Sequence, residues 1–311
     1  MLQYVVTGNV MIDNVYFSDG TVNKNQLGGP SVFAYTGVSL WTDDALLVCN
    51  VGRDFYDYFD DWVRQNEICT SGIVIKADHC NTCHLEYYED GTYGDRGLIT
   101  GDRFWENLGS LKTTPEDIEK FTMDGNVKGI YIAQNCDSVF WNKLGEMKQR
   151  DKFKIMWEIE APFATKKYMD KILHALTFTD IFSINLQEAQ KLTEAESEEK
   201  IIEQLKQLPV DMILFRVGER GLYTIHTGES YFHPSVKVDK VIDPTGCGNT
   251  STGAALYAYC EYRDPIKVGI MANVAAAMNL RQYGVIPDTK VLRSDALEQV
   301  ERLYKNYLHK I

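Results

Sequence analysis

The chain has 311 residues, of which 44% are hydrophobic and 24% charged, and this is enough apolar material for a main domain with a small appendage. A formal net charge of −12 repels phosphate backbones and anionic membranes, which excludes nucleic acid and membrane surfaces as expected partners. No window approaches the roughly 18 apolar residues that a membrane span needs, and no basic region precedes the first apolar run. We therefore expect a cytosolic protein without a signal peptide.

The first third of the chain mixes two kinds of pattern. Residues 2–12 predict a buried strand, and residues 29–41 predict a helix with Pro30 near its start. Residues 14–26 and 73–97 alternate apolar and polar side chains and contain Asp-Gly turn signals. These two segments predict short strands that form a small β-rich lid.

From residue 129 onward, expected strands and helices alternate, which predicts a mostly parallel sheet with helices on both faces. The fold class is therefore α/β, a three-layer sandwich with a lid. Its main domain comprises residues 1–13, 28–72 and 98–311, and its lid comprises residues 14–27 and 73–97. The expected strands are 130–133, 154–157, 181–184, 212–217, 222–226 and 231–233, and the expected helices are 138–148, 166–175, 198–208, 252–262, 265–283 and 294–308.

Asp243–Asn249 leads from an apolar strand end through a glycine turn into a helix. Gly246 and Gly248 allow a tight turn, so that the amides of Gly246, Cys247 and Gly248 can point at one spot beside the positive end of the helix. Such a spot suits a phosphate. An ordinary strand-to-helix turn with glycines is the simpler interpretation of the pattern by itself.

The longer string Asp-x-Thr-Gly-x-Gly resembles the C-terminal signature of the ribokinase-like (PfkB) carbohydrate kinases. Asn249 stands where that family has its catalytic aspartate. Further segments resemble the family in the expected order along nearly the whole chain, and no P-loop or Gly-x-Gly-x-x-Gly motif competes with them. The resemblance implies the ribokinase-like fold and an ATP- and Mg²⁺-dependent sugar kinase.

The resemblance also implies where the sugar binds. Asp13 corresponds to the aspartate that accepts hydrogen bonds from substrate hydroxyls, and Gly28 and Gly29 correspond to the diglycine beside the sugar. Phe33 stands where the family usually has an asparagine, so one polar contact is missing. From the sequence alone, Asp13 is equally well explained as a turn residue at a strand end.

Nucleotide and metal sites follow in the same way. Asn185 and Glu188 match an Asn-x-x-Glu motif that organises Mg²⁺ and phosphate, although their spacing also predicts a capping box. The resemblance places Asp243 and Thr245 beside a monovalent cation such as K⁺, and it implies a homodimer joined through the lid. The residues expected to border the nucleotide are Arg216, which replaces a threonine of the family, Gly218, Gly221 and Asn273.

Position 249 leaves two functions open. An amide cannot act as a general base near neutral pH, so we expect an attenuated kinase in which Asp13 or a water takes the proton. A non-catalytic sugar- or nucleotide-binding regulatory protein on the same fold is the alternative, and a dehydrogenase is disfavoured by the missing nicotinamide fingerprint. Cys80 and Cys83 resemble a metal or redox pair but lack completing ligands, which favours an exposed strand with incidental thiols.

Overall fold

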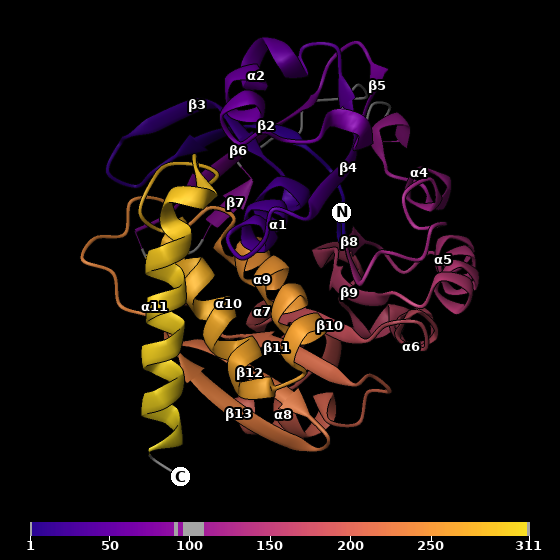
Figure 1. Cartoon of the computed structure of the whole chain (residues 1–311). Helices are drawn as coiled ribbons and strands as arrows, with labels where there is room; N and C mark the ends of the chain where they lie inside the picture. The colour runs from indigo at the N-terminus through magenta and orange to yellow at the C-terminus, as the bar shows by residue number, and fades with distance from the viewer. Residues whose placement is uncertain (1, 90–92, 96–108, 310–311) are drawn as a thin grey trace.

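A computed structural model describes residues 2–89, 93–95 and 109–309. Its largest feature is a nine-stranded sheet in the order β13-β12-β11-β10-β9-β8-β1-β4-β5 (Figure 1). The strands from β11 to β5 pair in parallel, and the last two pair antiparallel at one edge. The strands are β1 (Tyr4–Thr7), β4 (Ala45–Gly52), β5 (Ile73–Ala77), β8 (Gly129–Gln134), β9 (Lys154–Ile159), β10 (Ile181–Asn185), β11 (Met212–Arg216), β12 (Gly221–His226) and β13 (Glu229–Pro234).

Helices cover both faces of this sheet, which confirms the predicted three-layer sandwich. Successive strand residues belong to opposite apolar layers: Val6 and Tyr131 pack in one core, whereas Val5 and Ile130 pack in the other. In Figure 1, α9, α10 and α11 lie on one side of the molecule and α4, α5 and α6 on the other. The helices are α1 (Pro30–Ser39), α2 (Phe55–Gln65), α4 (Pro115–Glu119), α5 (Ser138–Asp151), α6 (Met169–Leu176), α7 (Leu186–Thr193), α8 (Glu198–Leu205), α9 (Cys247–Tyr262), α10 (Pro265–Asn279) and α11 (Thr289–Leu308).

A second sheet forms the lid, in the order β3-β2-β6-β7, where β2 and β6 run parallel and the other pairs antiparallel. Two boundaries of the predicted lid were wrong. Met11–Asp13 pairs within this sheet and not within the large one, and Ile73–Ala77 is the edge strand β5 of the large sheet. The predicted turn at residues 90–91 lies outside the described residues. The lid strands are β2 (Met11–Tyr16), β3 (Val22–Gly28), β6 (Asn81–Tyr87) and β7 (Tyr93–Asp95).

The predicted strand over residues 2–12 is two strands, because the chain breaks after Thr7 at Gly8, whose φ of 145° few other residues adopt. Strand β4 and helix α2 were not predicted. For β4 the reason is that a short apolar run such as 45–52 does not distinguish a strand from a helix. Helix α9 begins at Cys247, five residues before the expected start. Among the described residues, no helix is long and apolar enough to cross a membrane.

Helix α9 crosses α1 at very short range. A side chain at Gly37 of α1 would collide with the backbone carbonyl of Thr250, and one at Gly253 of α9 would collide with the carbonyl of Ala34. These two glycines therefore set the distance between the helices, and with it the position of the turn that starts α9.

We expect Gly37→Ala and Gly253→Ala each to lower the free energy of unfolding by about 1–3 kcal/mol, because each added methyl group overpacks the crossing. Chemical denaturation measures this loss. Gly109→Ala is the matched control, since its added methyl group meets nothing within 4 Å. Equal stability of all three variants would contradict the close crossing.

Candidate active site

The turn Asp243–Asn249 is held by a buried carboxylate. Asp243 is 1% exposed; its Oδ1 accepts a hydrogen bond from the Thr245 N–H at 2.8 Å, and its Oδ2 accepts one from the Gly284 N–H at 2.9 Å. The Thr245 carbonyl accepts a further bond from Asn279 Nδ2 at 2.8 Å. The two ends of the turn are thereby fixed before any ligand binds.

Helix α9 begins inside this turn, where Gly246 is its N-cap with a φ of 74°. The first helical bond runs from the Thr250 N–H to the Gly246 carbonyl at 2.8 Å. The amides of Gly248 and Asn249 precede that bond and so lie at the positive end of the helix dipole. The Cys247 N–H, expected to face a phosphate, donates instead to the Pro244 carbonyl at 3.3 Å.

Phe33 of α1 packs directly on this turn. Its ring, 2% exposed, fills the space into which a side chain at Gly246 would project. An aromatic ring thus lies beside the turn where a polar amide would be expected from the resemblance. The φ of Gly246 and the ring together require glycine at this position.

Asp13 lies on β2 against the end of β3. Its carboxylate occupies the space that a side chain at Gly28 would need, and it accepts a hydrogen bond from the Gly29 backbone N–H. Burial, together with the nearby charge of Asp243, raises the pKa of Asp13 to about 7. The diglycine therefore accommodates this carboxylate, and Asp13 is a carboxyl group that exchanges a proton near neutral pH.

Arg216, at the end of β11, is tied to a residue that the motif analysis missed. Its Nη2 donates to Glu158 Oε1 at 2.7 Å, with both side chains largely buried, and its Nη1 lies against Gly248. The guanidinium therefore adds positive charge beside the first turn of α9. The sequence signal for Glu158 is a single carboxylate within the apolar run 155–159.

The glycine turn thus presents the Gly248 and Asn249 amides, which precede the first helical hydrogen bond. The cation of Arg216 lies beside them, and the carboxyl group of Asp13 lies in the lid sheet. A sequence model of the pfkB family of carbohydrate kinases matches residues 1–291. The chain belongs to this family. The family membership accounts for the order of the motifs along the chain.

Three proteins to which this pfkB-family chain is similar share less than a third of its residues. It is 26% identical to an uncharacterised protein of Schizosaccharomyces pombe over 93% of this chain and 87% of that protein. It is 23% identical to a cytidine kinase of Thermococcus kodakarensis over 85% of this chain and 90% of that kinase. Its structure resembles an Arabidopsis thaliana ribokinase complexed with ribose and ATP, with a TM-score of 0.70, 16% identity, and 96% of this chain and 99% of the other covered.

Asn185 and Glu188 form the capping box of α7, as their spacing predicts. The Asn185 N–H donates to Glu188 Oε2 at 2.9 Å, and the Glu188 N–H donates to Asn185 Oδ1 at 2.9 Å. Burial raises the pKa of Glu188, and Arg216 opposes that rise. Asn185 and Glu188 offer the hard oxygen atoms that Mg²⁺ prefers, and a nearby cation would stabilise the ionised form of Glu188. The pair therefore fits a Mg²⁺ ion held through water.

The residues expected to border the nucleotide lie on separate elements. Gly218, with a φ of 67°, has open space around it, whereas Gly221 is needed for the close approach of β13. Asn273 of α10 is 7% exposed, and its Nδ2 donates to the carbonyls of His233 at 2.9 Å and Pro234 at 3.0 Å. Both N–H groups of Asn273 are thus engaged with the backbone, and its contact with a nucleotide stays a prediction.

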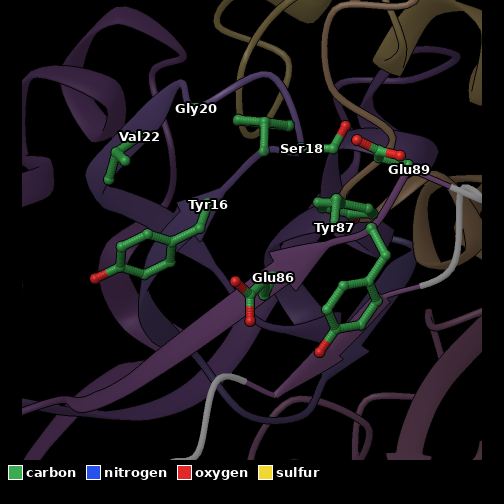
Figure 2. Close-up of a pocket in the computed structure, with 9 residues that line it drawn as sticks. Tyr16, Ser18, Gly20, Val22, Glu86, Tyr87 and Glu89 are labelled. Atoms are coloured by element: carbon green, nitrogen blue, oxygen red, sulfur yellow. The ribbon is translucent and has the colours of Figure 1, made fainter.

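The lid touches the turn through Tyr87 of β6, whose hydroxyl lies 2.9 Å from Thr245 Oγ1. The Tyr87 ring stacks on Phe17, which also contacts the Tyr283 ring. Beside these residues the lid contains a hollow of about 370 Å³ (Figure 2). Among the described residues, its lining comes from the lid: Tyr16, Phe17, Ser18, Gly20, Val22, Glu86, Tyr87, Tyr88 and Glu89.

Among the residues that the structure describes, the cysteines do not gather with other side chains into a metal site. Cys80 is buried, not exposed as expected; its Sγ accepts a hydrogen bond from the Gly52 N–H at 3.2 Å, and burial raises the pKa of its thiol to about 12. Burial likewise raises the pKa of Cys247 to about 12, so both thiols are protonated at neutral pH. Within the described part of the chain, no three His, Cys, Asp or Glu side chains are grouped as metal ligands.

Asp13→Asn tests the raised pKa of Asp13. As the pH rises from about 4 to about 7, Asp13 ionises in the unfolded chain but stays protonated in the folded one, so the native protein loses stability. Relative to the variant, that loss reaches about 4 kcal/mol, since three pKa units correspond to this energy. Urea denaturation of both proteins from pH 4 to pH 8 measures it, and a stability difference independent of pH would contradict it.

Proposed function

We propose that this protein transfers the γ-phosphoryl group of ATP to a hydroxyl of a sugar or sugar-like polyol. The supporting observation is the start of α9, where the Gly248 and Asn249 amides precede the first helical bond beside Arg216. Cytidine kinase acts on a nucleoside and the Arabidopsis ribokinase is complexed with ribose. Cytidine contains a ribose unit, as ribose itself does. We therefore propose a ribose or a nucleoside as the acceptor class.

The nucleotide would lie near Gly218, Gly221 and Asn273, with its γ-phosphate at the turn. The acceptor oxygen forms a bond to the γ-phosphorus while the bond to the β–γ bridging oxygen breaks, and that electron pair leaves with ADP. Amides already aimed at the phosphoryl oxygens stabilise the developing charge without reorganising. Glu188 would hold Mg²⁺ through water, and the bound ion would neutralise charge on the phosphates.

The hydroxyl proton goes to Asp13 in this proposal. Asp13 is buried beside the diglycine, and a pKa of about 7 lets it accept a proton near neutral pH. Asn249 cannot take the proton, so its amide serves only as a hydrogen-bonding group. We further propose Asp243 and Thr245 as the site of K⁺, and the lid as the contact between two subunits.

A non-catalytic binding protein is the second candidate, and the Phe33 ring against Gly246 favours it. That ring replaces a polar contact beside the very turn that would receive the phosphate. Such a protein would bind ATP or a sugar in a calorimeter and form no phosphorylated product.

The deciding experiment incubates the protein with ATP, Mg²⁺, and K⁺ or Na⁺, against pentoses, hexoses and nucleosides, with products identified by mass spectrometry. We expect a phosphorylated ribose or nucleoside, faster turnover with K⁺, and about a hundredfold lower turnover in Asp13→Asn. Asp124→Asn, at an exposed loop carboxylate, is the control with native turnover. Absence of product with every acceptor, together with measured ATP binding, would favour the second candidate.

A further inference from the structure

Glu158, which belongs to none of the kinase motifs, lies at the centre of a buried cluster. It is 7% exposed on β9, where its register partners are Ala133 of β8 and Ser183 of β10; Tyr131 lies two residues before Ala133 on β8, and Arg216 ends β11. These four parallel strands are neighbours, so their carboxyl ends open at the same edge of the sheet. Helix α9 packs on all four of them.

Both oxygens of the Glu158 carboxylate are engaged. The Tyr131 hydroxyl donates to Oε2 at 2.6 Å, and Arg216 Nη2 donates to Oε1 at 2.7 Å. Bonds to an ionised acceptor in a buried site are strong; loss of Arg216 would leave the buried charge unpaired, and loss of the Tyr131 hydroxyl would leave Oε2 without its donor. Glu158 therefore fixes the positions of a hydroxyl and a guanidinium at once.

Each of these two groups reaches the start of α9. Arg216 Nη1 fills the space beside Gly248, and the Asn249 side chain is a hydrogen-bond partner of the Tyr131 hydroxyl. Because Tyr131 gives its only proton to Glu158, its oxygen can only accept from position 249. The partner atom is therefore the Asn249 amide nitrogen, which leaves the amide oxygen for a ligand.

A carboxylate at position 249 does not suit these surroundings. It has no hydrogen to donate, so its oxygens would face the lone pairs of Tyr131. It would also add negative charge to a cluster that already contains Glu158 and Glu188 around the cation Arg216, which is already paired. The Tyr131 side chain is fully buried, so solvent does not screen the repulsion.

We propose that Glu158 is a positioning residue that orients the Asn249 amide through Tyr131 and Arg216 through a direct ion pair, so that the site is built for an amide at position 249. In this view the asparagine at position 249 suits the surrounding cluster, and its presence is more than the loss of a catalytic base. The catalytic part of this proposal rests on the proposed kinase function, whereas the coupling between Glu158 and position 249 does not.

A ligand-free double-mutant cycle tests the coupling. Asn249→Asp is introduced into the native protein, into Glu158→Gln and into the matched control Glu160→Gln, a partly exposed carboxylate two residues further along. We expect Asn249→Asp to lower the folding equilibrium constant about tenfold or more in the native and control backgrounds, but less than about twofold with Glu158→Gln, where Arg216 can pair with the new carboxylate. Urea denaturation at pH 7.5 supplies the constants.

Tyr131→Phe is a second background, which keeps the test decisive if Glu158→Gln does not fold. It removes the oxygen that faces position 249, and we expect the loss caused by Asn249→Asp to shrink there as well. An equal loss in all four backgrounds, or no loss in the native protein, would overturn the proposal. The absence of ATP binding and turnover in the native protein would instead count against the kinase function, and the cycle would still decide the coupling.

Steady-state kinetics separate positioning from a purely structural role. We expect Tyr131→Phe to lower kcat about tenfold with an unchanged KM for ATP, and Glu158→Gln to raise that KM as well through Arg216. We also expect the double variant Asn249→Asp/Glu158→Gln to exceed Asn249→Asp alone in kcat. A full gain of activity from Asn249→Asp alone would contradict a site built for the amide.

Discussion

The close crossing of α1 and α9 is the constraint on which the site depends. Two helices approach to backbone contact only where glycines replace side chains, and Gly37 and Gly253 provide this on opposite sides of the interface. The crossing brings Phe33 onto the turn at Gly246 and holds the start of α9 at the edge of the sheet. The buried Asp243 carboxylate then shapes the turn itself.

Sequence patterns predicted the layers, the second half of the fold and the glycine turn, because alternating apolar strands and amphipathic helices are visible over short windows. They did not predict that Met11–Asp13 and Ile73–Ala77 pair in the sheets where they do. Sheet membership depends on contacts between segments far apart in the chain. For the same reason the sequence did not predict the roles of Glu158 and Tyr131, although a single carboxylate in an apolar run is a signal for Glu158.

The three positions at which the sequence is expected to depart from the family pattern lie close together in the folded protein. Phe33 packs on Gly246, Arg216 packs on Gly248, and Asn249 bonds to Tyr131. All three therefore surround one helical turn, where a change at one position alters the space or charge available at the next. This proximity explains how replacements far apart in the sequence are compatible with one another.

The hydrogen bond between Tyr87 and Thr245 gives the lid a direct effect on the turn. Thr245 immediately precedes the N-cap of α9, so a movement that separates the two hydroxyls frees the Thr245 side chain, while Asp243 and Asn279 still hold its backbone. The lid and the start of α9 are thus linked directly through one side-chain contact.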